Sequence, residues 1–291
     1  AATFSETMSV PGTYRYQRRA TFGCGSVVTA SVDVQVYSTT HNAGAISGAN
    51  ACAGGTVTIS STTAATTGTP ASSGPTYSWE RAPGPGFSAW TARPGTGASL
   101  SETVAAPGTY RYRRTATFGC GTPVSTTTDV TVYSTTHNAG AISGSAICEG
   151  GTVNITNTTA ASTGTPASSG PTYSWDRAPG PGFSVWTPLT GSGATFSETM
   201  ATAGTYRYRR TATYGCGTPV SATTDVAVNP LPSPVISGPD NVCQHPTNTI
   251  NYSTPNVPGN TYSWSVTLGT ISGPSTGNSV NIIWNTPGAG T

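Results

Sequence analysis

The chain repeats itself at an interval of 96 residues. The stretch TYRYRRTATFGCG begins at Thr109 and recurs as TYRYQRRATFGCG from Thr13 and as TYRYRRTATYGCG from Thr205. A period of about 100 residues is the size of one small autonomous domain and is longer than the repeat unit of a solenoid protein. The sequence therefore predicts a string of similar domains.

The same interval predicts where each unit begins and ends. Residues 1–37 match only the last part of a unit, whereas 38–133 and 134–229 are complete units. Residues 230–291 begin a fourth, diverged unit that stops before any TYRYRR equivalent arrives. We expect the chain to be a fragment of a longer array.

Each unit is expected to be an all-β sandwich. No segment shows a sustained 3.6-residue apolar period, and short Val, Thr and Tyr runs alternate with period two between Gly, Pro and Ser clusters. Low aliphatic content raises the question of disorder, but the net charge is only +2, and 13 Tyr and 6 Trp supply bulky core material. Many short strands with frequent turn signals are typical of immunoglobulin-like sandwiches.

Period two also assigns faces to the strands. In the second complete unit the strands are expected within 141–148, 151–159, 171–177, 183–189, 194–200, 204–217 and 220–229. A Trp on the third strand and a Tyr after a Gly at the start of the sixth occupy the positions of the central Trp and corner Tyr of immunoglobulin-like sandwiches. The predicted core aromatic residues are Tyr77, Trp79, Tyr110, Tyr112, Tyr173, Trp175, Tyr206 and Tyr208.

Arginines on the opposite face of the sixth strand are expected to form cross-strand ion pairs. The expected pairs are Glu80 with Arg111 or Arg113, and Asp176 with Arg207 or Arg209. Arg114 and Arg210 fall on the aromatic face instead, and we expect them to stack on a core aromatic ring at the edge of the sandwich.

Cysteine spacing favours one disulfide in each complete unit. Cys52 and Cys120 are 68 residues apart, as are Cys148 and Cys216. These two pairings would leave Cys24 and Cys243 with partners outside the fragment. Disulfides of this kind imply an oxidising, extracytoplasmic compartment.

A second connectivity stays open, because connectivity is not deducible from sequence alone. The turn after the first strand and the turn before the last strand lie at opposite poles of an immunoglobulin-like sandwich. If the early cysteine lies in that first turn, Cys52 would face the late cysteine of the next unit, Cys216, and the bridge would join two units.

No recurring constellation suggests catalysis, a bound metal or a cofactor. There is no GxSxG elbow, no CxxC motif and no DxDxDG loop, and only three His lie along the chain. His41 and His137 are expected to be polar residues of the segment between units. The chain contains no Lys, which rules out Lys–Asn isopeptide cross-links. We expect no enzyme activity, no nucleic-acid partner and no membrane insertion.

The segment RAPGPGFSAW, repeated as RAPGPGFSVW, is the one candidate binding surface. Exposed aromatic side chains at the edge of a sandwich can stack on sugar rings, but the favoured interpretation is that both tryptophans pack inward behind a tight hairpin. The candidate glycan contacts are Arg81, Phe87, Trp90, Arg177, Phe183 and Trp186.

The motifs resemble a known group of proteins. CxGGTVxI, TYSWxR and GTYRYRRTATxGCG are similar to the Ig-like and PKD-like repeats of giant Bacteroidota cell-surface adhesins, which include gliding-motility adhesins of the SprB type. The resemblance implies that 1–37 is the C-terminal part of an Ig-like repeat, that 38–133 and 134–229 are complete Ig-like repeats, and that 230–291 begins a diverged PKD-like repeat.

The same resemblance implies a mechanical function outside the cell. It favours the stalk of a secreted bacterial surface adhesin or fibre, built as an extended array and exported by the type 9 secretion system. The alternatives are a glycan-binding module array and a self-assembling surface filament. The expected partners are neighbouring repeats of the same chain, with surface glycans or identical chains as further candidates.

Overall fold

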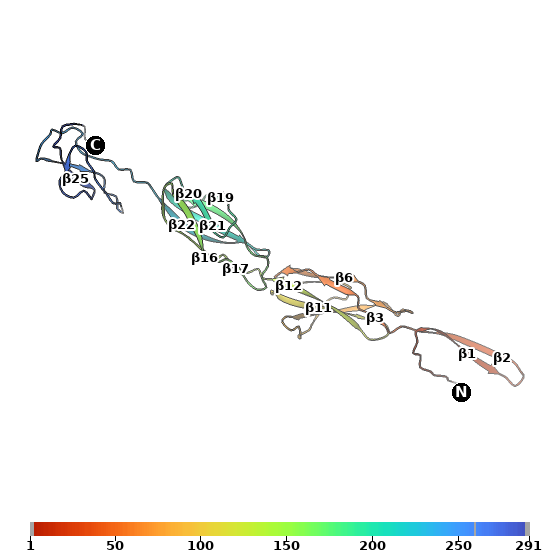
Figure 1. Cartoon of the computed structure of the whole chain (residues 1–291). Helices are drawn as coiled ribbons and strands as arrows, with labels where there is room; N and C mark the ends of the chain where they lie inside the picture. The colour runs from red at the N-terminus through yellow and green to blue at the C-terminus, as the bar shows by residue number, and fades with distance from the viewer. Residues whose placement is uncertain (1–2, 259, 289–291) are drawn as a thin grey trace. The chain divides into compact units, whose positions relative to one another are not determined.

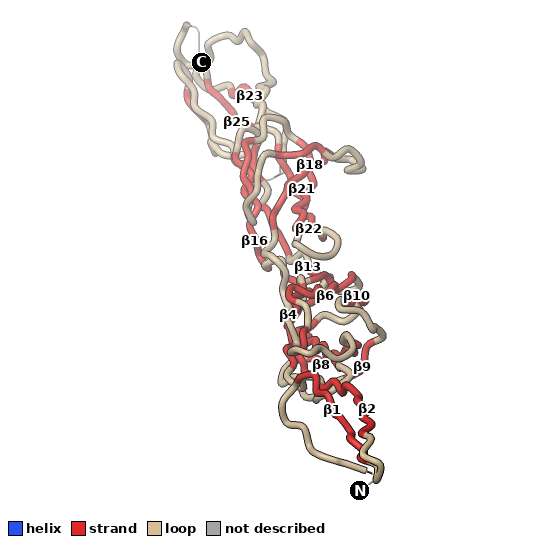
Figure 2. The backbone as a smooth tube through the Cα atoms, turned by 90° about the vertical axis from the view of Figure 1, so that its right-hand side faces the viewer, coloured by secondary structure: helices blue, strands red, loops and turns tan. Residues whose placement is uncertain are grey.

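The computed structural model describes residues 3–258 and 260–288, and all the regular structure in this part of the chain is β-strand (Figures 1 and 2). Because these residues form no helix, they include no helix that could cross a membrane. The chain divides into two compact units, Ala1–Val228 and Asn229–Thr291. The finer boundaries expected between repeats stay a prediction.

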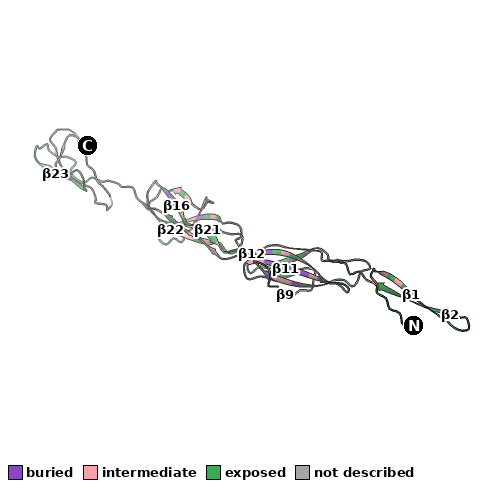
Figure 3. Ribbon diagram, turned by 60° about the horizontal axis from the view of Figure 1, so that its bottom comes forward, coloured by how far each residue is buried: buried purple, intermediate pink, exposed green. Residues whose placement is uncertain are grey.

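The N-terminal segment is a single long hairpin. Strand β1 (Gly12–Thr21) pairs antiparallel with β2 (Val27–Val36), from Gly12 opposite Val36 to Thr21 opposite Val27. The two strands form a sheet of their own, and most of their residues are exposed (Figure 3). Val34 is 41% exposed, whereas its equivalent one repeat later, Val130, is 1% exposed because a second sheet covers it.

The first complete repeat is a two-sheet sandwich. One sheet has the order β10-β6-β4 and the other the order β5-β12-β11-β8-β9, with β5 parallel to the last strand, β12. A short ladder of β3 with β7 lies beside them. The strands are β3 (His41–Asn42), β4 (Ala45–Gly48), β5 (Ala51–Cys52), β6 (Thr56–Thr63), β7 (Thr66–Thr67), β8 (Thr76–Pro83), β9 (Thr91–Arg93), β10 (Leu100–Thr103), β11 (Gly108–Thr117) and β12 (Val124–Tyr133).

Period two along β11 separates core from surface as the sequence predicts. Tyr110, Tyr112, Arg114 and Ala116 are buried, and the residues between them are only partly buried. Tyr110 donates its hydroxyl to the carbonyl oxygen of Ala106 at 2.9 Å, which is the corner-tyrosine contact of immunoglobulin-like sandwiches. The core therefore has the expected immunoglobulin-like construction.

The second complete repeat follows the same plan 96 residues later. Its sheets have the orders β14-β16-β20 and β15-β22-β21-β18-β19, and β13 pairs with β17. The first expected strand is divided between the two sheets, because β14 and β15 belong to different layers. The strands are β13 (His137–Asn138), β14 (Ala141–Gly144), β15 (Ile147–Cys148), β16 (Thr152–Thr159), β17 (Ser162–Thr163), β18 (Thr172–Pro179), β19 (Thr187–Leu189), β20 (Phe196–Thr199), β21 (Gly204–Thr213) and β22 (Val220–Asn229).

The eight aromatic residues assigned to the core fall into two groups. Trp79, Tyr110, Tyr112, Trp175 and Tyr208 are buried. Tyr77, Tyr173 and Tyr206 are partly buried.

The described residues of the C-terminal unit form a small sheet. Its order is β23-β25-β24, from β23 (Thr249–Ser253), β25 (Ser279–Ile283) and β24 (Thr270–Ile271). Val280 and Ile282 provide its buried apolar side chains.

Candidate functional site at the junction of two repeats

A disulfide joins the two complete repeats. Cys52 is bonded to Cys216, with a Cα–Cα distance of 5.5 Å and a sequence separation of 164 residues. We call this bond the inter-repeat disulfide. It corrects the expected pairing of Cys52 with Cys120 and of Cys148 with Cys216; in this structure Cys120 and Cys148 are free thiols.

The two cysteines of one repeat are too far apart to pair. Cys52 ends β5, which lies beside the last residue of β12, Tyr133. Cys120 lies in the turn that precedes β12, which begins at Val124. Ten residues of strand therefore separate them, or about 30 Å at roughly 3.3 Å per residue. Disulfide geometry requires Cα atoms within about 7 Å, so the partner has to come from outside the repeat.

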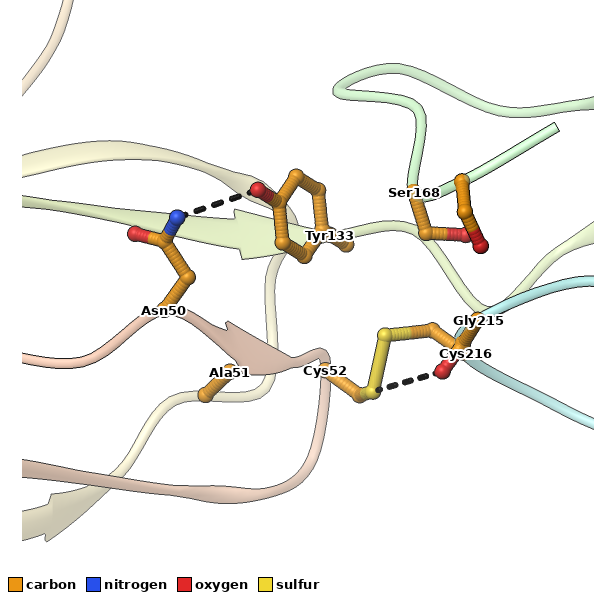
Figure 4. Close-up of a pocket in the computed structure, with 8 residues that line it drawn as sticks. Asn50, Ala51, Cys52, Tyr133, Ser168, Gly215 and Cys216 are labelled. Atoms are coloured by element: carbon orange, nitrogen blue, oxygen red, sulfur yellow. Dashed lines mark hydrogen bonds between the residues drawn. A yellow bond between two sulfur atoms is a disulfide. The ribbon is translucent and has the colours of Figure 1, made fainter.

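An open pocket surrounds the inter-repeat disulfide (Figure 4). On the side of the first repeat, Asn50 donates from Nδ2 to the hydroxyl of Tyr133 at 3.0 Å. Across the junction, the Sγ atom of Cys52 lies 4.0 Å from the carbonyl oxygen of Gly215. A disulfide sulfur carries no proton, so this second contact is packing. The pocket is lined by Asn50, Ala51, Cys52, Tyr133, Ser168, Ser169, Gly215 and Cys216.

A histidine holds the hairpin that carries each late cysteine. The imidazole of His137 contacts Thr163 Oγ1 through Nδ1 at 3.0 Å and the carbonyl oxygen of Cys216 through Nε2. Its ring stacks on Tyr214 with centroids 4.3 Å apart. Gly217 has a φ of +81°, and a Cβ there would lie 2.4 Å from the ring nitrogen. The GCG sequence therefore needs its second glycine.

His41 makes the same contacts in the first repeat. It reaches Thr67 Oγ1 at 3.0 Å and the carbonyl oxygen of Cys120, and it stacks on Phe118 at 4.4 Å. The expectation that His41 and His137 are merely polar segment residues misses this contact. The chain that enters each repeat is fixed to the hairpin at the same pole.

Arg114 is fully buried in the first repeat. It donates to the carbonyl oxygens of Ala43 and Ala98 at 2.7 and 3.0 Å and to Ser61 Oγ at 2.8 Å. Its guanidinium lies over the ring of Tyr77 at 4.9 Å, as the sequence predicts, although 0% of the residue is exposed. Arg114 therefore ties the segment that enters the repeat to both sheets.

Arg210 has the same role in the second repeat. It donates to the carbonyl oxygens of Ala139 and Ala194 and to Asn157 Oδ1, at 2.7, 3.0 and 2.8 Å. Its guanidinium lies 5.0 Å from the ring centre of Tyr173.

A polar cluster links the two sheets inside each sandwich. Glu102 on β10 accepts hydrogen bonds from Arg81 at 2.8 Å and from the hydroxyl of Tyr112 at 2.7 Å, both on the opposite sheet. Burial, followed by the hydrogen bond to Glu102, raises the pKa of Tyr112 above its ordinary value. Tyr112 lies two residues after the corner tyrosine, where antibody-type domains place the second cysteine of their inter-sheet disulfide. Here a hydrogen-bonded cluster takes that position.

The outer face of the five-stranded sheet carries a ladder of charges and aromatic rings. Arg111 pairs with Asp129 at 2.6 Å and lies 4.2 Å from the ring centre of Phe87. Arg113 pairs with Glu80 at 2.6 Å and lies 4.2 Å from the ring of Trp90. The hydrogen bond from Arg111 holds the pKa of Asp129 below its usual value.

This ladder separates the candidate glycan contacts from one another. Arg81 is on the inner side of the sandwich, whereas Phe87 and Trp90 lie against arginines on the outer face of the sheet. The expected inward packing of Trp90 is therefore wrong, because the loop folds back over the outside of its own sheet. The equivalents in the second repeat are Arg177 bonded to Glu198, Phe183 under Arg207, and Trp186 under Arg209, which pairs with Asp176.

No protein-family model matches this chain, and no curated protein does. Among solved structures, it is similar to a run of domains from titin, with a TM-score of 0.42 and 16% identity over 74% of each chain. It is also similar to a Ca²⁺-stabilized adhesin that helps an Antarctic bacterium bind ice, with a TM-score of 0.38 and 14% identity over 94% of this chain and 74% of that one. A 1.5-MDa bacterial ice-binding adhesin gives a TM-score of 0.37 and 13% identity over 84% and 86%.

These similarities are too distant to carry an argument about function. The described residues contain no cluster of His, Cys, Asp or Glu that could hold a metal ion. The function has to be inferred from the contacts of the chain itself.

Proposed function

We propose that the chain is a stalk region of a secreted cell-surface adhesin or fibre, whose repeats span distance and carry force. The observation that supports this proposal is the covalent bond between successive repeats. Two repeats that were merely tethered would need only the main chain between Tyr133 and Ser134.

The inter-repeat disulfide changes the path of a pulling force. Load that enters the first complete repeat reaches Cys52, crosses to Cys216 and leaves along β22. The segment 53–215 between the two cysteines is bypassed, and it includes most of both cores. On the chain-entropy model, a disulfide that closes a loop of this length stabilises the folded state by about 5 kcal/mol.

The same bond supports a location outside the cytoplasm. Disulfides form and persist in oxidising compartments, and thiol systems keep cytosolic cysteines reduced. The finer proposal of a gliding-motility adhesin exported by type 9 secretion rests on the sequence resemblance.

Adhesion under flow tests the mechanical role. Cells that produce the protein are compared with cells that produce the C52S/C216S variant, after equal surface display has been verified by antibody labelling. We expect variant cells to detach at lower shear stress, because their repeats can unravel. Equal detachment curves would contradict the proposal.

A glycan array tests the binding-module alternative. The guanidinium groups cover one face of Phe87 and of Trp90, and Arg81 is committed to Glu102, so we expect no glycan to bind. Binding that is lost in a Trp90→Ala variant would replace the stalk proposal with a carbohydrate-binding one.

A further inference from the structure

Each complete repeat presents an early and a late cysteine at opposite poles. The early cysteines of the two repeats have the same backbone contacts. At the early position, Gly55 donates its N–H to the carbonyl oxygen of Cys52 at 2.8 Å, and Gly151 donates to that of Cys148 at 2.9 Å. Both turns end a short strand that belongs to the five-stranded sheet. Cys148 is thus held in the same way as the bonded Cys52.

The late cysteines match in the same manner. The carbonyl oxygen of Cys120 contacts the ring of His41, just as that of Cys216 contacts the ring of His137. Gly121 has a φ of +85°, close to the +81° of its equivalent in the second repeat. The hairpin that carries Cys120 is therefore built like the hairpin that is already cross-linked.

The two complete repeats thus contain four cysteine positions that could each form half of such a bridge, and two of them are used. The inter-repeat disulfide joins the early cysteine of one repeat to the late cysteine of the next. What remains is an early thiol at one end of the pair of repeats, the exposed Cys148, and a late thiol at the other end, the partly buried Cys120. The two unused halves are complementary.

The surfaces beside the two free thiols are compared with the surfaces beside the inter-repeat disulfide, and only the early side differs. The late side of the first repeat, formed by Ser72, Ser73, Gly119 and Cys120, has the same sequence as the bonded late side, Ser168, Ser169, Gly215 and Cys216. On the early side, Ala146 replaces Asn50 and Asn229 replaces Tyr133, so the hydrogen bond between those two side chains is absent there. Both replacements are smaller side chains.

We propose that Cys148 of one chain and Cys120 of a second copy form the same bridge, so that copies join end to end. Two S–H bonds are broken and one S–S bond forms. The two electrons and two protons pass to a small-molecule disulfide, which is reduced to two thiols. The stalk function does not require this association, so failure here would leave the flow assay to decide the stalk proposal.

The test uses the 291-residue chain with Cys24 and Cys243 replaced by serine. Three proteins are compared: this background, the background with C120S, and the background with C148S. Each is reduced and then reoxidised with oxidised glutathione, and intact mass verifies that the inter-repeat disulfide has formed. Non-reducing electrophoresis and peptide mapping then follow cross-linking between chains.

The expected pattern is directional. The background forms a ladder of dimers and longer chains, each single variant stays monomeric, and an equimolar mixture of the two variants stops at a dimer that contains the Cys148–Cys120 peptide. Dimers of either single variant in the same yield as in the mixture would mean unspecific thiol oxidation. That result would overturn the proposal, as would a monomeric background with the inter-repeat disulfide intact.

Discussion

Opening the inter-repeat disulfide should release a large, calculable length of chain under force. With the bond closed, pulling on the ends can extract only 38–51 and 217–228 from the two repeats, or about 90 Å at roughly 3.5 Å per residue. With the bond open, the bypassed segment 53–215 can extend as well, which adds about 570 Å before the folded end-to-end distance is subtracted.

Optical tweezers with handles at the two ends of the chain measure this difference. The wild-type chain is stretched with and without dithiothreitol, and the C52S/C216S variant is stretched without it. We expect the long release only in the reduced chain and in the variant. The matched control, C120S/C148S, should behave like the oxidised wild type, because neither residue belongs to the bond.

A single outcome would refute this reasoning. If the oxidised wild type gave the full release without reductant, the load would not pass through the disulfide. The bypass would then play no part in the mechanics of the repeats.

Three further predictions concern the contacts that support the junction and the cores. Replacing Arg114 by Met should cost about 4 kcal/mol in unfolding free energy, because buried acceptors lose their donor, whereas Arg113→Met on the surface should cost less than about 1 kcal/mol. Because the folded pKa of Tyr112 is raised, the contribution of this residue to stability should be constant below about pH 10 and be lost as the pH rises further, and Tyr112→Phe should make the alkaline fall in stability shallower. Replacing His137 by Ala should speed reduction of the inter-repeat disulfide, whereas His41→Ala should not, because only His137 holds the bonded hairpin.

Denaturant unfolding, alkaline titration and dithiothreitol kinetics check these in turn. Equal costs for the two arginine variants would show that Arg114 is not a structural cation. If stability fell as steeply with alkaline pH in the Tyr112→Phe variant as in the wild type, Tyr112 would not be the cause of the fall. Equal reduction rates in the two histidine variants would contradict the assigned contact.

Much of the fold follows from periodicity in the sequence. Alternation along TYRYRRTAT predicts that Tyr110 and Tyr112 face the core, and the structure buries both. The same rule places Arg81 on the inner face, two residues from Trp79. Strand alternation therefore predicts an inward Arg81 that can reach Glu102, whereas the adjacent Pro-Gly loop suggests a surface position.

The remaining features depend on contacts between distant parts of the chain. Arg114 bonds the carbonyl oxygen of Ala43, 71 residues away, and a backbone acceptor leaves no mark in a sequence. The position of Trp90 depends on how its loop folds over the sheet, which strand alternation does not describe. The disulfide depends on which poles meet, and equal spacing within each unit favours the wrong pair.

Immunogold labelling of intact cells tests the central claim most directly. Antibodies raised against the purified chain are applied to unpermeabilised cells that produce the protein and, in parallel, to lysed cells. We predict gold particles outside the cell envelope on intact cells, at a distance that grows when further copies of 38–229 are inserted. Labelling confined to lysed cells would contradict the account of this chain as a surface stalk.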